Sequence, residues 1–237
     1  MRVAPDIVRP DTCRPFFPRA PVMSDRESLR QRLGAGLAAL NIRLDDTAIA
    51  RLLDYVELLE RWNATYNLTA VRDPAEMVTR HLLDSLAIAP YVSGKTLADL
   101  GTGAGLPGIP LAIAAPERRF VLIDSNGKKA RFLREAVRRL GLVNVEVVEG
   151  RVESVEEFFD CVTARAFTSL AEMLAWGGHL LAPEGEWLAL KGRFPQDEVA
   201  AMPEEFRIER TIRLDVPGLD ADRHLVVIKR AIPHAND

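Results

Sequence analysis

The sequence predicts an α/β fold: a mostly parallel sheet of seven strands with helices on both faces and a small N-terminal helical unit. Three observations support this prediction. Short apolar runs alternate with helical stretches after Lys95, as in parallel strands joined by helical crossovers. The last two runs are separated by Pro217 and Gly218 instead of a helix, which favours an antiparallel hairpin at one edge. Between Ser24 and about Pro90 the pattern is helical.

Seven apolar runs are the predicted strands: Thr96–Leu100, Phe120–Ile123, Val143–Val148, Cys161–Ala164, Trp187–Leu190, Ile208–Leu214 and Leu225–Ile228. Five stretches between them are predicted helices: Pro107–Ala115, Lys128–Leu140, Glu153–Phe158, Ser169–Trp176 and Gln196–Met202.

The N-terminal third divides into a tail and a helical unit. Residues 1–22 contain five prolines and four arginines without an apolar period, so we expect a disordered tail. Met23 is followed by a helical pattern, and our hypothesis is that translation begins there and the tail is not native. Residues 23–92 are the expected helical unit and residues 93–237 the sheet-containing domain. Asp73 and Pro74 predict a capped helix that ends near Ala89.

Composition excludes several classes of protein. With 48% hydrophobic and 27% charged residues, the chain is neither collagen-like nor wholly disordered. No window approaches about 18 uncharged apolar residues, which argues against a transmembrane helix and favours a cytoplasmic location. Cys13 and Cys161 lie too far apart in unlike surroundings to suggest a disulfide framework or a metal site. The net charge of -3 permits only a local basic face for nucleic acid.

The strongest motif runs from Ala98 to Gly108 and follows the first predicted strand. Its glycines let the backbone approach a nucleotide or nucleoside closely. Gly103, Gly105 and Gly108 match the dinucleotide fingerprint G-x-G-x-x-G, a weak pattern by itself. Asp99, just ahead of them, would repel a pyrophosphate but could hold the ammonium group of S-adenosylmethionine.

Further candidate residues follow the next strands. Asp124 lies 23 residues after Gly101, where a carboxylate binds ribose hydroxyls of either cofactor. Val152 and Glu153 offer an apolar side chain and a carboxylate to an adenine ring, although Glu153 also suits the first turn of a helix. Arg165 ends the fourth predicted strand, so we expect its side chain at the ligand site. A cation at this position, in place of a polar or acidic group, favours a substrate whose nucleophilic atom has no proton to lose, such as a ring nitrogen with a free lone pair.

The sequence resembles a known family, the small-subunit ribosomal RNA guanine-N7 methyltransferases, also called glucose-inhibited division protein B. The resemblance covers about residues 50–230. Its markers are Tyr66-Asn67-Leu68-Thr69, Val71-Arg72-Asp73-Pro74, Arg80-His81-Leu82-Leu83-Asp84-Ser85, Asp99 to Pro110, Arg165-Ala166-Phe167, Leu190-Lys191-Gly192 and Arg223 to Lys229.

The resemblance implies a class I S-adenosylmethionine-dependent, Rossmann-like methyltransferase that modifies N7 of one guanine in the decoding-region loop of bacterial 16S rRNA. The expected partner is 16S rRNA or the 30S subunit, with no membrane and no metal. Expected contacts to the methyl donor are Gly101, Leu106, Val152, Glu153 and Arg165, together with Gly103 and Asp124. Two alternatives remain: a nicotinamide-dependent oxidoreductase, and a nucleotide- or RNA-binding protein without turnover.

Candidate RNA contacts are basic. The segment Gly127–Leu140 has six basic residues and one acid, and we expect Lys128 and Lys129 to lie nearest the site. Lys191 is a comparable candidate. Arg80, His81 and Asp84 share one helix, where they either contact RNA or tie the N-terminal unit to the sheet. The remaining histidines show no metal-ligand spacing.

Overall fold

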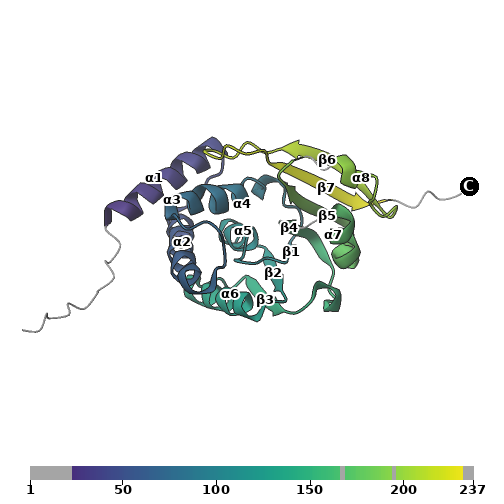
Figure 1. Ribbon diagram of the computed structural model, residues 1–237, viewed down its shortest axis with the longest axis horizontal. Helices are drawn as coiled ribbons and strands as arrows, with labels where there is room; N and C mark the ends of the chain where they lie inside the picture. Colours follow the sequence, from purple (N-terminus) through teal and green to yellow (C-terminus); the bar gives the residue numbers. More distant parts are fainter. Residues whose placement is uncertain (1–22, 166–168, 194–195, 232–237) are drawn as a thin grey trace, which may run out of the picture.

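A computed structural model describes residues 23–165, 169–193 and 196–231 of the chain (Figure 1). The expectations for the tail and for the start of translation lie outside these residues. The seven-stranded sheet has the order β3-β2-β1-β4-β5-β7-β6. Its strands are β1 (Thr96–Leu100), β2 (Arg119–Asp124), β3 (Val145–Glu149), β4 (Phe159–Arg165), β5 (Leu181–Lys191), β6 (Phe206–Arg213) and β7 (His224–Arg230).

Strand directions confirm the predicted mixed sheet. Neighbouring strands from β3 through β5 pair in parallel, whereas β7 is antiparallel to both β5 and β6. The edge hairpin therefore places the start of β7 beside the carboxyl end of β5, with Lys191 opposite His224. The carboxyl ends of β1, β2, β3 and β4 share one edge of the sheet, where ligands bind in folds of this type.

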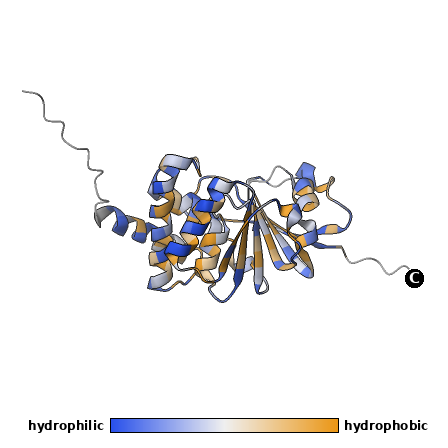
Figure 2. Ribbon diagram, turned by 90° about the horizontal axis from the view of Figure 1, so that it is seen from below, coloured by the Kyte–Doolittle hydropathy of each residue, from blue (hydrophilic) through white to orange (hydrophobic). Residues whose placement is uncertain are grey.

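Helices cover both faces of the sheet (Figure 2). The crossover elements are α5 (Gly108–Ala114), α6 (Gly127–Leu140), η3 (Val152–Ser154), α7 (Leu170–Gly177), η4 (Gly178–Leu180) and α8 (Gln196–Val199). Alternate strand residues enter two separate cores: Leu97 and Leu122 belong to the first, and Ala98 and Ile123 to the second. This division follows from the two-residue repeat of side chains along a strand.

The crossover between β3 and β4 corrects the sequence prediction. The expected helix Glu153–Phe158 is wrong: a single 3-10 turn covers Val152–Ser154, and residues 155–158 are not helical. Six residues nucleate a helix poorly without packing to support it. Here Phe158 is 65% exposed and the Glu157 carboxylate is paired with Arg119 on β2. The helix predicted to end at Met202 also stops early, at Val199.

The N-terminal helices are α1 (Met23–Ala39), α2 (Asp46–Tyr66), α3 (Pro74–Met77), the π-helix η1 (Val78–Leu83), α4 (Asp84–Leu86) and the 3-10 helix η2 (Ala89–Tyr91). Asp73 caps α3 by accepting a hydrogen bond from the Ala75 amide, as predicted. Leu52, Leu59 and Leu82 enter the same core as Leu97 and Phe132. The division between residues 92 and 93 stays a prediction. No helix in the described ranges is long and apolar enough to cross a membrane.

Candidate functional site

The glycine-rich segment forms a tight loop between β1 and α5. Gly101, Gly103 and Gly105 adopt φ values of 60°, 63° and 89°, a region that side chains other than glycine rarely enter. The Thr102 amide donates to the Ile123 carbonyl at the end of β2, which joins the loop to the neighbouring strand. A Cβ atom placed on Gly103 would meet nothing closer than 3.8 Å. The backbone is therefore open at Gly103, as close contact with a ligand requires.

Asp99 lies beneath this loop and is fully buried. Its Oδ2 accepts hydrogen bonds from the Thr102 hydroxyl at 2.5 Å and from the Gly108 amide at 2.9 Å. Burial raises the pKa of the carboxyl to about 7, although both hydrogen bonds and the charge of Arg165 act in the opposite direction. The enclosed carboxylate thus fixes the two ends of the loop. Within the described residues its Oδ1 is buried and accepts no hydrogen bond, so the expected contact between Asp99 and a ligand stays a prediction.

Asp124 ends β2 and faces the loop from the side. Its Oδ2 accepts from the Gly103 amide at 2.9 Å, and its Oδ1 accepts from the Asn126 amide at 2.8 Å. Lys129 Nζ lies 3.8 Å from Oδ2. Each carboxylate oxygen has a second lone pair, so these bonds leave acceptor capacity for ribose hydroxyl groups.

Three further candidates lie near the ends of β1 and β3. The Gly150 amide donates to the Asp124 carbonyl, which brings the start of η3 beside β2. There Val152 is buried and Glu153 is exposed. The Leu106 side chain is buried in the first core, while its amide donates to the Thr102 carbonyl at 3.1 Å. Contact of these residues with a ligand remains a prediction.

Arg165, at the end of β4, pairs with the N-terminal helices. Its Nη1 lies 3.2 Å from Asp84 Oδ2, and Arg223 Nε donates to Asp84 Oδ1 at 2.8 Å. His81, on the same helical segment as Asp84, shares a 2.9 Å hydrogen bond with the Thr69 hydroxyl. Of the two roles considered for His81 and Asp84, these contacts favour the link between the N-terminal unit and the sheet.

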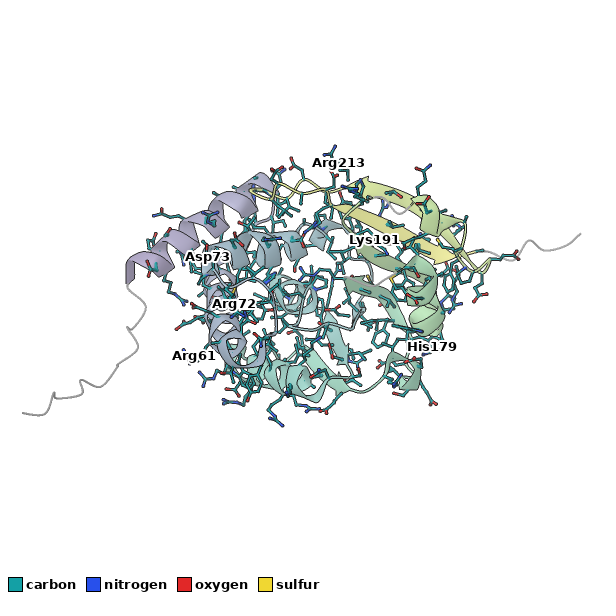
Figure 3. The ribbon with its side chains drawn as sticks, in the orientation of Figure 1. Arg61, Arg72, Asp73, His179, Lys191 and Arg213 are labelled. Atoms are coloured by element: carbon teal, nitrogen blue, oxygen red, sulfur yellow. The ribbon has the colours of Figure 1, made fainter. Side chains whose placement is uncertain are left out.

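The predicted basic helix is largely paired with acids of this chain. Lys129, Arg134, Arg138 and Arg139 form ion pairs with Asp124, Glu149 and Glu135. Within the described part of the chain, Lys128 and Arg131 form none, so they are the residues of α6 whose charge is available to a phosphate. Lys191, the last residue of β5 and labelled in Figure 3, pairs with Glu198 at 2.8 Å.

A family described as rRNA small subunit methyltransferase G matches residues 48–226. The chain belongs to this family. A relative of that name from Xanthomonas campestris pv. campestris (strain 8004) is 58% identical over 200 residues, which are 84% of this chain and 93% of the relative. Another, from Neisseria meningitidis serogroup C, is 50% identical and covers 85% of this chain and 98% of its own length.

Solved structures support the fold of this family member. Mitomycin 7-O-methyltransferase MmcR superposes with a TM-score of 0.57 at 17% identity, over 90% of this chain and 69% of its own. The tRNA methyltransferase TrmK of B. subtilis gives 0.50 at 14% identity, over 62% of this chain and 65% of its own. Family membership and fold together decide for the predicted methyltransferase and against the nicotinamide-dependent oxidoreductase.

Two residues of the site were missed by sequence reasoning. Tyr55 on α2 donates a hydrogen bond to the Ala104 carbonyl of the glycine loop. Arg223 supplies the second partner of Asp84. Tyr55 carries no local motif, and Arg223 was noted only as part of the family resemblance. In the described ranges, no group of three or more His, Cys, Asp or Glu residues is arranged to hold a metal ion.

Proposed function

We propose that this chain transfers the methyl group of S-adenosylmethionine to N7 of one guanine in the decoding-region loop of 16S rRNA, in the cytoplasm. The family match over residues 48–226 carries the proposal. The site supports it, because the open backbone at Gly103 and the carboxylate of Asp124 lie together at the carboxyl edge of the sheet. The proposed donor contacts are Gly101, Gly103, Leu106, Asp124, Val152, Glu153 and Arg165.

The reaction needs orientation more than acid–base chemistry. The bound donor supplies a methyl group on a positively charged sulfur that is itself a good leaving group. Guanine N7 has a free lone pair at neutral pH, which forms the new N–C bond as the C–S bond breaks, so no base is needed. Holding N7 in line behind the methyl carbon can contribute about 7–11 kcal/mol to lowering the barrier.

Arg165 has a restricted part in this scheme. A hydrogen bond from its guanidinium to N7 would occupy the nucleophilic lone pair, and its charge would oppose the positive charge that develops on guanine. We therefore assign Arg165 to an oxyanion or carbonyl instead: the donor carboxylate, an RNA phosphate or guanine O6. Lys128 is the first proposed phosphate contact, and Lys129 and Lys191 would have to leave Asp124 and Glu198 to bind a phosphate as well. RNA affinity should then fall with rising salt.

Transfer of a labelled methyl group tests the proposal. The substrates are naked 16S rRNA and 30S particles, both from a strain that lacks this protein, and the modified base is mapped afterwards. Label at a single guanine supports the proposal and shows which of the two substrates is used. Donor binding without transfer to either substrate would favour a binding protein without turnover, and absence of donor binding would contradict the interpretation of the glycine loop.

A further inference from the structure

Asp84 connects the N-terminal helices to the carboxyl edge of the sheet. Its side chain is only 3% exposed and receives two guanidinium groups, Arg165 from the end of β4 and Arg223 from the segment before β7. These partners are 81 and 139 residues away in the sequence. The ion pairs therefore join three separate parts of the chain, unlike the exposed pairs between neighbouring residues on α6.

A π-helical turn places Asp84 in this position. The π-helix Val78–Leu83 ends directly before Asp84. Turns of π-helix are rare in proteins as a whole, and those that occur are often found at functional sites. Both His81 and Asp84 are buried here, and the Arg80 carbonyl accepts a weak hydrogen bond from Arg165 Nη1 at 3.4 Å. One helical segment thus contacts the Arg165 guanidinium twice, which restricts its direction.

The segment itself is anchored from α2. Asn63 Oδ1 accepts from the Thr69 amide at 2.9 Å, and the Thr69 hydroxyl contacts His81 Nε2. Burial, followed by the charge of Arg165, lowers the pKa of His81 to about 4, so the imidazole is neutral at pH 7. A neutral His81 adds no positive charge beside the guanidinium groups of Arg165 and Arg223. The carboxylate of Asp84 is then the charge that offsets theirs.

Arg165 itself lies next to the glycine loop. The two residues before it, Thr163 and Ala164, pair in register with Asp99 and Leu100 at the end of β1. Two guanidinium groups share one carboxylate, so the cluster of Asp84, Arg165 and Arg223 keeps one positive charge. That charge is available to an oxyanion at this edge of the sheet.

We propose that Asp84 is a positioning residue for methyl transfer, which holds the Arg165 guanidinium beside the glycine loop so that it binds an oxyanion of the donor or of the RNA. This inference rests on the proposed function. The donor carboxylate and an RNA phosphate present the same chemistry to Arg165, and separate measurements of donor and RNA affinity distinguish them.

The test compares Asp84→Asn, Arg165→Gln and the double variant in the full chain. Misplacement of a positioned group by about 1 Å can cost on the order of 100-fold in rate, and we expect Asp84→Asn to lower kcat/KM by about 30-fold or more. Since Asp84 acts through Arg165, the double variant should lose no more than Arg165→Gln alone, to within about threefold. A loss in donor affinity indicates the carboxylate, and a loss in 30S affinity indicates a phosphate.

Asp160→Asn is the matched control. Asp160 lies near the start of β4, at the opposite end of that strand from Arg165. Its Oδ2 accepts from the amides of Lys95 and Thr96. Its replacement should lower the melting temperature and leave kcat/KM unchanged. If Asp84→Asn does not fold, Asp84→Glu keeps the charge and displaces it by one methylene, and the same comparison is made with that variant.

Three results would overturn the proposal. The first is a folded Asp84 variant with wild-type kcat/KM. The second is a double variant in which the losses in kcat/KM of the two single variants multiply. The third is an Asp84 variant whose affinity for the donor and for 30S particles is unchanged. A wild-type protein that binds the donor and transfers methyl, with Asp84→Asn unaffected, defeats this proposal alone. A wild-type protein that binds no donor defeats the proposed function as well.

Discussion

The Tyr55 hydroxyl of α2 donates a 2.7 Å hydrogen bond to the Ala104 carbonyl, in the middle of the glycine loop. Tyr55 is fully buried, and burial raises the pKa of its hydroxyl, so the group stays a proton donor at every working pH. The loop is therefore supported from two sides, by Asp99 beneath it and by a helix of the N-terminal unit.

Tyr55→Phe should weaken donor binding. The variant leaves the buried Ala104 carbonyl without its donor, which costs about 1–3 kcal/mol and lets the loop move. Calorimetric titration with the donor, alongside thermal unfolding, should show a lower affinity and a lower melting temperature. Tyr66→Phe on the same helix is the control, because Tyr66 is 37% exposed and should tolerate the change. Equal donor affinity in both variants would mean that the hydrogen bond does not support the loop.

Asp124→Asn should reduce donor affinity by about tenfold or more, because the amide replaces one acceptor oxygen with a donor and removes the negative charge. Glu149→Gln is the control, since Glu149 lies directly opposite Asp124 on β3 and pairs with Arg134 at the surface. Titration with S-adenosylmethionine compares the two. A larger loss from Glu149→Gln would move the ribose site away from Asp124.

Alanine substitutions separate steric demand from backbone strain. Gly105 and Gly141 both have positive φ, so each alanine carries a strain of about 1–2 kcal/mol. An alanine at Gly105 would also place its Cβ 2.4 Å from Ile109 Cδ1, whereas Gly141 has open space. Urea unfolding should therefore show a clearly larger loss of stability for Gly105→Ala than for Gly141→Ala. Similar losses would mean that the loop or the Ile109 side chain moves to accommodate the added methyl group at little cost in stability.

The pH dependence of stability should report Asp99. Folding raises its pKa from the ordinary 3.8 to about 7, so the folded protein holds this proton more tightly than the unfolded chain. The resulting stabilisation is complete below about pH 4 and is lost as the pH rises through 7. Asn resembles the protonated acid. The melting temperature of Asp99→Asn relative to wild type should therefore increase between about pH 5.5 and pH 8.

Asp160→Asn supplies the contrast for this measurement. Hydrogen bonds from the Lys95 amide and from Thr96 lower the pKa of Asp160, so this carboxylate is ionised over the whole range in both states. Its variant should keep a constant difference from wild type. A constant difference for Asp99→Asn as well would show that Asp99 is ionised throughout.

Local sequence patterns were enough to predict the framework of the fold. The strands, the edge hairpin and the glycine loop each depend on residues close together in the chain, such as Pro217 and Gly218 or Gly103 and Gly105. Periodicity failed where tertiary contacts decide the local structure. The segment after Val152 has helical spacing, yet Glu157 pairs with Arg119 and the chain runs into β4 without a helix.

The contacts that complete the site could not be predicted from spacing. Asp84 meets Arg165 and Arg223 across 81 and 139 residues of the chain, and nothing in the sequence around Asp84 specifies those partners. The Asp99 carboxyl accepts from the Gly108 amide at the start of α5, a contact that its place in the motif did not predict. The Asp84 contacts follow from packing between elements that are distant in the sequence.

Cleavage at 7-methylguanosine tests the central claim most directly. The 16S rRNA of 30S particles from a strain lacking this protein is treated with borohydride and aniline before and after incubation with the purified chain and S-adenosylmethionine. We expect one new cleavage, at a guanine of the decoding-region loop, that is absent without the donor. A methylated product without cleavage at any guanine would contradict transfer to N7.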